Sequence, residues 1–286
     1  MKNKDFVVFI ITNGRPDKVK TISTLNKCNY TGPLYLVLDN EDKTVESYYK
    51  NFGKEKIIIF DKLAIAKTID NGDNFENYRS TTHARNACFN IAENLGYKYF
   101  LVLDDDYTAF TYKYDNNLKY KGVKYPKDLG AIFDITLDYF INTPAITSIA
   151  YAQGGDFFGG EASAGLPKLK RKCMNSFFCS TDRKFTFISR LNEDVNTYIT
   201  LGSRGTLFLT MTNFGLQQAQ TQSNKGGMTE AYLKSGTYVK SFYSVMYCPS
   251  FMKVYQMSSK NARIHHNTDW IAAVPVIINQ KHKKHA

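Results

Sequence analysis

Three consecutive aspartates, Asp104, Asp105 and Asp106, directly follow an apolar run at residues 99–103. Branched and aromatic side chains at five successive positions predict a strand that is covered on both faces. The carboxyl end of such a strand is where open α/β sheets bind their ligands. Asp104 and Asp106 are spaced to converge on one hard cation, which would usually serve a phosphate. The alternative is a solvated acidic turn, but the position after so apolar a strand favours a binding site.

The length and composition of the chain predict a soluble globular protein. The 286 residues suit one large domain or a domain with an elaborated second half, and 43% hydrophobic content provides a core. The apolar run at residues 6–11 is too short for a secretory or membrane segment. Five cysteines without a CxxC pair argue against a disulfide framework or a zinc site. We therefore expect a cytoplasmic protein without a membrane contact.

The chain carries 37 basic and 26 acidic residues, a formal charge of +11. Such an excess favours a polyanionic partner such as nucleic acid. Many enzymes that handle phosphates are also basic, so the charge alone does not separate these classes.

Hydrophobic patterning predicts strands alternating with helices over the first hundred residues, and hence a mainly parallel sheet with right-handed crossovers. Strands are predicted at 6–11, 34–38, 56–60, 99–104, 145–153, 183–189, 206–211, 251–257 and 274–278. Helices are predicted from Pro16, over 79–97 with Ser80, Thr81 or Thr82 as the cap and Gly96 as the stop, over 128–142, and after Asn192. Residues 107–127 are expected to form a loop or irregular hairpin, 161–180 an irregular chain, and 212–228 a lid or a plain flexible loop.

Six short motifs occur in an order that resembles the nucleotide-sugar-dependent glycosyltransferases of the GT-A fold. They are residues 12–17 (TNGRPD), residues 83–86 (HARN), Asp104–Asp106, the glycine-rich residues 154–160, residues 192–194 (NED), and a late histidine. The resemblance covers nearly the whole chain. More narrowly, the chain is similar to the TET-associated glycosyltransferases, a largely phage-encoded family whose members are thought to glycosylate hydroxymethylated pyrimidines in DNA. If a phage encodes this chain, the expected location is the host cytoplasm.

The resemblance implies a Mn²⁺ or Mg²⁺ ion that neutralises the donor diphosphate of a UDP-sugar. Asp106 is the first candidate ligand and Asp104 the second, whereas Asp105 is expected to contact the ribose or the sugar. His265 matches a further ligand by position. His266 is the alternative, and a pair of ordinary surface histidines is an equal explanation.

The acids Glu193 and Asp194 resemble a motif that begins an acceptor-facing helix. In inverting members of the fold, the last acid removes the proton from the acceptor hydroxyl, so Asp194 is the first candidate base and Glu193 the next. Acids also suit a helix N-terminus, and both roles are compatible. In a retaining enzyme the same acid would bind the donor sugar, and no base would be required.

Four further residues are expected to contact the donor nucleotide. Arg85 begins the helix before the metal strand, where a cation opposes the helix dipole and so favours a functional role. Thr12, Arg15 and Asp39 lie at the ends of predicted strands, placed to hold base and ribose. A simple turn without a ligand explains Gly14 and Pro16 in this segment equally well.

The glycine-rich residues 154–160 would let the backbone approach a sugar, with Gly155 and Asp156 as the contacts, although a turn without a ligand is an equal alternative. Basic and aromatic stretches at 107–127 and 166–190 could pair with phosphates and stack on a displaced base. A run of lysines is more often a solvated face, so the DNA acceptor depends mainly on the resemblance.

We therefore expect an α/β, GT-A-like, Rossmann-type enzyme in which residues 1–106 bind the nucleotide sugar. Residues 107–286 would form the acceptor-binding and catalytic half of the same domain. The predicted reaction moves a sugar from a UDP-sugar to the hydroxymethyl group of pyrimidines such as 5-hydroxymethylcytosine in double-stranded DNA. Alternatives are a polysaccharide, lipid or protein acceptor, a nucleotidyltransferase, for which the lysine-rich activation motif is missing, or a non-catalytic DNA-binding protein. No obligate protein partner is indicated.

Overall fold

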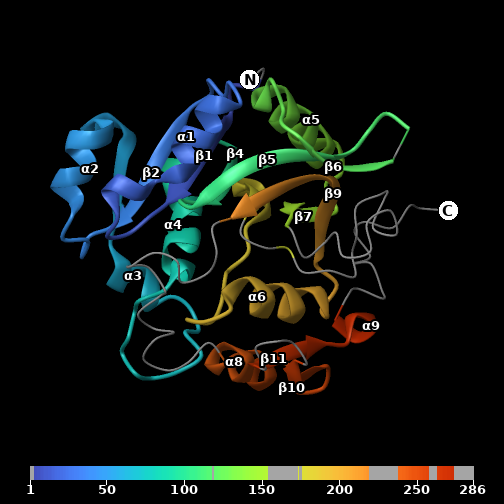
Figure 1. The fold of residues 1–286 in the computed structure, drawn as a ribbon. Helices are drawn as coiled ribbons and strands as arrows, with labels where there is room; N and C mark the ends of the chain where they lie inside the picture. Colours follow the sequence, from blue (N-terminus) through green and yellow to red (C-terminus); the bar gives the residue numbers. More distant parts are fainter. Residues whose placement is uncertain are drawn as a thin grey trace.

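A computed structural model describes residues 3–117, 119–153, 173, 176–218, 238–257 and 263–273. Its main feature is a nine-stranded sheet with the order β3-β2-β1-β4-β8-β7-β9-β5-β6 (Figure 1). The strands are β1 (Phe6–Ile11), β2 (Leu34–Asp39), β3 (Ile57–Phe60), β4 (Tyr99–Asp104), β5 (Tyr107–Tyr114), β6 (Tyr120–Lys124), β7 (Ile146–Ala152), β8 (Ser176–Ser180) and β9 (Leu207–Gln218). Only β5 and β8 run against the other strands of this sheet. The predicted α/β fold with a mainly parallel sheet is confirmed.

Helices cover both faces of the sheet. They are α1 (Lys20–Lys27), α2 (Val45–Phe52), α3 (Lys62–Ala66), α4 (Thr81–Asn94), α5 (Leu129–Asn142), α6 (Glu193–Gly202), α8 (Val239–Tyr247) and α9 (Trp270–Ala273). Alternate residues of β1 belong to different cores: Phe6 and Val8 pack with α1 and α5, whereas Val7 and Phe9 pack with α4 and α6. Because successive strand side chains point to opposite faces, a strand buried on both faces must be apolar throughout.

A two-stranded sheet of β10 (Met252–Met257) and β11 (Arg263–Thr268) lies outside the central sheet. It packs against α8, which in turn contacts α6. Figure 1 shows α6 between the central sheet and this outer layer. None of the helices in the described ranges is long and apolar enough to cross a membrane.

Local signals set the ends of the helix that precedes the acidic strand. The Ser80 hydroxyl accepts a hydrogen bond from the backbone N–H of Thr82 at 3.1 Å, which caps the start of α4. Gly96 follows its last turn with a φ of +77°, a conformation that favours glycine. The helix predicted over 79–97 is therefore confirmed, together with its cap and its stop.

The structure corrects the prediction in the second half of the chain. The strand predicted at 183–189 is a 3-10 turn (Thr181–Arg183) followed by chain outside any strand, and β8 instead occupies residues 176–180, which were expected to be irregular. Residues 212–218, expected to belong to a mobile loop, continue β9. Strands β5 and β6 pair as a hairpin with an irregular register, which is one of the two forms predicted for residues 107–127. The strand predicted at 274–278 lies outside the described residues.

The aromatic core beneath α5 provides a test of this packing. Phe133 is fully buried, and its ring lies against those of Phe6, Tyr30, Phe110, Tyr151 and Phe178. We expect Phe133→Ala to lower the free energy of unfolding by about 3–5 kcal/mol, measured by urea denaturation. Ile135→Ala on the same helix, where the side chain is 66% exposed, is the control and should change it by less than about 1 kcal/mol. Equal effects of the two substitutions would contradict the assignment of this core.

Candidate active site

The carboxyl ends of β1, β2 and β4 meet at one edge of the sheet. Ile11, the last residue of β1, lies opposite both Val37 of β2 and Asp104 of β4. This register brings Thr12, Asp39 and Asp104 to the same edge, as the sequence predicted. Parallel strands end together, so residues far apart in the chain become neighbours here.

Asp105 is buried and faces the loop after β1. Its Oδ2 accepts a hydrogen bond from Thr12 Oγ1 at 2.6 Å and lies 2.9 Å from Arg15 Nε. The Tyr48 hydroxyl lies 2.7 Å from Thr12 Oγ1 and accepts from the backbone N–H of Arg15 at 3.1 Å. Asp105 therefore fixes the loop that carries Thr12 and Arg15, and its expected contact with the ribose or the sugar stays a prediction.

Asp39 lies beside this loop at the end of β2. Its Oδ2 accepts from Asn13 Nδ2 at 2.8 Å, and its Oδ1 lies 2.9 Å from Lys62 Nζ. The next turn of the loop is held in the same manner, because the backbone N–H of Gly14 donates to Asp42 Oδ2 at 2.8 Å. The polar groups that were predicted to hold base and ribose are therefore gathered and rigidly placed.

A buried arginine joins the aspartate cluster to the second acidic motif. Arg85 Nη2 donates to Asp104 Oδ1 at 3.0 Å, and Nη1 lies 3.1 Å from Glu193 Oε1. The guanidinium lies over the rings of Phe177 and Phe187, and the residue is only 1% exposed. Arg85 is the countercharge between two acids that are 89 positions apart in the chain, and its expected contact with the nucleotide stays a prediction.

The carboxylates at this edge are held in an environment that disfavours their negative charge. Burial, with the neighbouring charges of Asp106 and Glu193, raises the pKa of Asp104 to about 7 against the lowering effect of Arg85. Burial also raises the pKa of Asp105 to about 6, and it raises the pKa of Asp106. Like charges out of water favour an added cation, so the cluster has the electrostatics of a metal site.

Asp104 and Asp106 keep one oxygen each for a metal. Asp104 Oδ1 is taken by Arg85, and Asp106 Oδ1 accepts from Gln218 Nε2 at 2.9 Å, whereas no described residue occupies either Oδ2. Hard oxygen ligands suit Mg²⁺ or Mn²⁺, and such ions often use one or two carboxylates, with water and substrate phosphates as the other ligands. The residues present fit such an ion.

The structure does not bring His265 to the aspartates. His265 lies on β11 opposite Tyr255, and its ring centroid is 4.3 Å from that of His266. Among the described residues no group of three or more His, Cys, Asp or Glu side chains could hold a metal. The reason is topological, since β11 pairs with β10 outside the central sheet and its residues do not reach the edge where β4 ends. Gly155 and Asp156, expected to contact the sugar, lie outside the described residues.

Glu193 and Asp194 begin α6 and differ in how far they are engaged. Glu193 Oε1 accepts from Thr81 Oγ1 at 2.5 Å in addition to its ion pair with Arg85. Asp194 Oδ1 accepts from the backbone N–H of Val195 at 2.8 Å, and no described residue contacts its Oδ2. A carboxylate oxygen without a partner is available to take a proton, so the geometry favours Asp194 over Glu193 as a base.

Several residues of the site were missed in the sequence, namely Tyr48, Asp42, Lys62, Thr81 and Gln218. Asp42 follows the predicted strand end within four residues, a spacing that could have marked it. Gln218 was assigned to a flexible loop, although the apolar residues that continue past Met211 carry β9 to it. Tyr48 and Lys62 give no such signal, because only the packing of α2 and α3 brings them to this edge.

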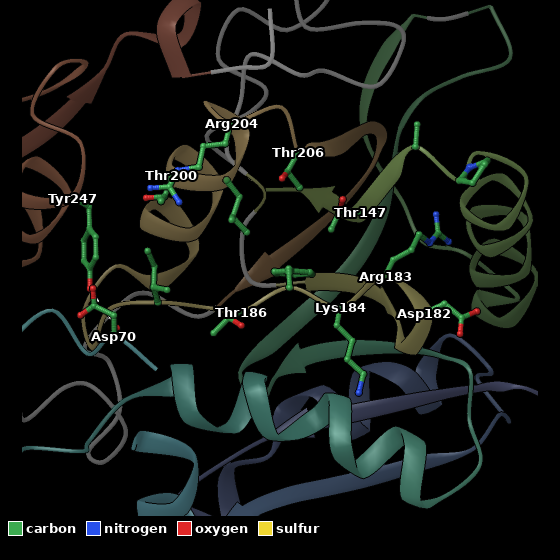
Figure 2. Close-up of a pocket in the computed structure, with 15 residues that line it drawn as sticks. Asp70, Thr147, Asp182, Arg183, Lys184, Thr186, Thr200, Arg204, Thr206 and Tyr247 are labelled. Atoms are coloured by element: carbon green, nitrogen blue, oxygen red, sulfur yellow. Dashed lines mark hydrogen bonds between the residues drawn. The ribbon is translucent and has the colours of Figure 1, made fainter. Parts of the chain in front are cut away.

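A separate groove of about 660 Å³ lies elsewhere on the protein (Figure 2). Asp70, Tyr247, Thr200, Arg204 and Arg183 are among the residues that line it. It reaches Thr200 and Leu201 near the C-terminal end of α6, about 11–12 Å along the helix from Glu193 at 1.5 Å per residue. None of the predicted site residues lines this groove.

An α/β sheet with clustered acids at its strand ends and a second acid motif beside them is the arrangement that the sequence resemblance to nucleotide-sugar glycosyltransferases implies. The model of the TET-associated glycosyltransferase family matches residues 6–227. The chain therefore belongs to this family and is a glycosyltransferase. No curated protein matches it in sequence.

Two solved structures are similar in overall fold. One is glucosyl-3-phosphoglycerate synthase from Mycobacterium tuberculosis in complex with Mn²⁺, UDP and phosphoglyceric acid, with 9% identity over 95% of this chain and 88% of that chain and a TM-score of 0.46. The other is a mycobacterial protein, with 7% identity over 92% and 83% of the two chains and a TM-score of 0.47. At this level of similarity no function is transferred from them.

The role of Arg85 as a countercharge can be tested by its removal. We expect Arg85→Gln to lower the free energy of unfolding by about 3–5 kcal/mol at pH 8, because it leaves Asp104 and Glu193 buried without their cation. Arg204→Gln, at an exposed position, is the control and should change it by less than about 0.5 kcal/mol. A loss below about 1 kcal/mol for Arg85→Gln in urea denaturation would contradict the role.

His83 predicts a pH dependence of stability. Its neutral ring donates from Nε2 to Asn71 Oδ1 at 2.9 Å, and burial lowers the pKa of His83 from 6.5 to about 4. Unfolding between these values takes up a proton, so this stabilisation is complete above pH 6.5 and is lost as the pH falls through 4.

In His83→Gln the difference in unfolding free energy from the wild type should therefore shrink by roughly 3 kcal/mol between pH 7 and pH 4. Urea denaturation at a series of pH values measures it. A difference that stays constant over this range would show that His83 titrates normally in the folded protein.

Proposed function

We propose that the protein is a metal-dependent glycosyltransferase that moves a sugar from a UDP-sugar to the hydroxymethyl group of modified pyrimidines, such as 5-hydroxymethylcytosine, in double-stranded DNA. The observation that carries the proposal is the ion-paired chain of Asp104, Arg85 and Glu193. It joins the acids suited to a donor diphosphate directly to the acids suited to an acceptor hydroxyl. A transfer between two substrates needs both sites at one place.

On the donor side, Asp104 and Asp106 would hold a Mn²⁺ or Mg²⁺ ion through their Oδ2 atoms. When bound, the ion supplies positive charge to the departing diphosphate. Thr12, Arg15 and Asp39 line the same edge and would orient the nucleotide. Their positions are fixed before the donor arrives, because the buried Asp105 carboxylate holds Thr12 and Arg15.

On the acceptor side, Asp194 would act as the base in an inverting transfer. Its Oδ2 takes the proton of the hydroxymethyl group, whose oxygen attacks the anomeric carbon while the bond from that carbon to the diphosphate oxygen breaks. Glu193 does not compete for this role because Arg85 and Thr81 already engage it. If the reaction retains configuration, Asp194 would instead hold the donor sugar.

Two features support DNA as the acceptor, namely membership of the TET-associated family and a net charge of +11. A phosphate backbone is attracted by such a charge without regard to sequence. A modified base in a duplex would have to leave the stack to reach an enclosed site. In this proposal residues 1–106 bind the donor and residues 107–286 supply the acceptor contacts and Asp194.

The decisive assay incubates the purified protein with UDP-sugars, Mn²⁺ or Mg²⁺, and duplex DNA that contains 5-hydroxymethylcytosine. We expect transfer of the sugar to the DNA, detected by mass spectrometry of the released nucleosides, and loss of transfer when EDTA removes the metal. Hydrolysis of the donor without transfer to DNA would contradict the proposal that DNA is the acceptor. The acceptor would then be a polysaccharide, a lipid or a protein.

Asp106→Asn tests the metal site. The change removes one charged ligand and keeps the side-chain shape, so we expect metal-dependent turnover to fall at least a hundredfold while the melting temperature stays within a few degrees. Asp138→Asn, at an exposed position on α5, is the control and should turn over like the wild type. Undiminished turnover in Asp106→Asn would remove this residue from the metal site.

A further inference from the structure

The backbone immediately before Glu193 and Asp194 has an unusual conformation. Ser189 and Asn192 have φ values of +75° and +60°, in the left-handed region that few residues other than glycine adopt. Such conformations persist only where the surrounding structure enforces them, and they concentrate at functional sites. Contacts from three neighbouring elements hold the turn at residues 189–192, which we call the acid turn.

The start of α4 provides the first set of contacts to the acid turn. Thr82 Oγ1 donates to the carbonyl oxygen of Ser189 at 2.6 Å, and Ser80 Oγ donates to that of Arg190 at 2.8 Å. Ser189 Oγ closes the turn on itself by donating to the carbonyl of Leu191 at 2.6 Å. These contacts align the turn with the helix that carries Arg85.

The loop between α3 and α4 provides the second set. Arg190 donates to Asp73 Oδ2 from Nε at 2.9 Å and from Nη2 at 2.8 Å, and the Tyr243 hydroxyl donates to the same oxygen. The Arg190 and Asp73 side chains are only 9% and 10% exposed. Charged hydrogen bonds that are shielded from water hold their geometry more firmly than exposed ones.

Helix α8 provides the third contact, at the left-handed residue that begins α6. Asn192 Nδ2 donates to Ser244 Oγ at 2.6 Å, and both residues are buried. The carbonyl of Asn192 accepts the first hydrogen bond of α6, from the backbone N–H of Asn196 at 3.0 Å. The side chain of Asn192 is thus anchored to α8 while its backbone sets the direction in which α6 begins.

We propose that Asn192 and Ser244 are positioning residues for the transfer reaction, assisted by the Asp73–Arg190–Tyr243 cluster. They hold the acid turn in its left-handed form so that Glu193 meets Arg85 and Asp194 keeps its Oδ2 open toward the acceptor. This inference rests on the proposed function. It makes α8, a helix without any predicted site residue, a determinant of the catalytic rate.

Two serines on α8 give a matched test. Ser244 and Ser241 are both fully buried, but the Ser241 hydroxyl has no hydrogen-bond partner in the described residues. Ser244→Ala should lower kcat for transfer at least tenfold, because a small displacement of a catalytic group is costly, and leave KM for the UDP-sugar unchanged. Ser241→Ala should keep both values. Equal kcat values in the two variants would overturn the proposal.

A pair of changes at Asn192 separates the backbone from the side chain. Glycine adopts the left-handed conformation without strain, whereas alanine resists it. Asn192→Gly should therefore retain a kcat several-fold above that of Asn192→Ala, although both lack the amide. The same kcat in both variants would show that the left-handed conformation at residue 192 does not set the rate, and that result would overturn the proposal.

Hydrogen exchange keeps this test separate from the proposed function. Ser244→Ala should speed exchange of the Asn196 amide, which bonds to Asn192, at least several-fold relative to Ser241→Ala. If the wild type shows no transfer, the proposed function fails, and the exchange rates alone decide the positioning inference. Equal exchange in the two variants would then overturn it.

Discussion

The candidate site depends on the burial of one guanidinium group between two carboxylates. Arg85 is almost fully shielded from water and pairs with Asp104 on one side and Glu193 on the other. Bringing three charges out of water is costly, and their mutual attraction compensates only when the geometry is maintained. Burial alone would lower the pKa of Arg85, but the neighbouring carboxylates raise this pKa, so the guanidinium remains charged. The end of β4 and the start of α6 are therefore held together by a pair of contacts that neither element could form alone.

This constraint extends outward in two directions. On the donor side, Asp105 has no contact with Arg85, but it fixes Thr12 and Arg15 at the end of β1. On the acceptor side, the left-handed turn at 189–192 fixes the first residues of α6, and it is supported by α4, by the loop before α4 and by α8. Rigid elements thus surround both halves of the site. Asp104, Asp106 and Asp194 each keep one carboxylate oxygen without a hydrogen-bond partner among the described residues. These oxygens lie where ligands would be needed.

The contrast between Asp105 and Asp106 shows how far residue type determines a role. The two are adjacent and chemically identical, yet Asp105 is 2% exposed and paired with protein groups, whereas Asp106 contacts Gln218 and keeps one oxygen open. Both lie in the turn between β4 and β5, where Asp105 reaches Thr12 after β1 and Asp106 reaches Gln218 at the end of β9. A sequence motif of three acids identifies the place, and the direction of each side chain decides which of them keeps an oxygen free of described protein groups.

The sequence by itself determined the first four strands, the capped helix over residues 81–94, the α/β class and the clustering of acids at the strand ends, because hydrophobic period and helix caps are local properties. It was wrong about 176–189 and 212–218, where short apolar segments become strands only if a neighbour pairs with them. Only the tertiary structure showed that Arg85 pairs with Asp104 and Glu193, that Asp105 pairs with Thr12 and Arg15, and that His265 lies on a different sheet from Asp104. Contacts in the tertiary structure also place three further residues at the site, namely Tyr48, Gln218 and Ser244. Each of these outcomes depends on contacts between segments distant in the chain, and a local pattern does not contain that information.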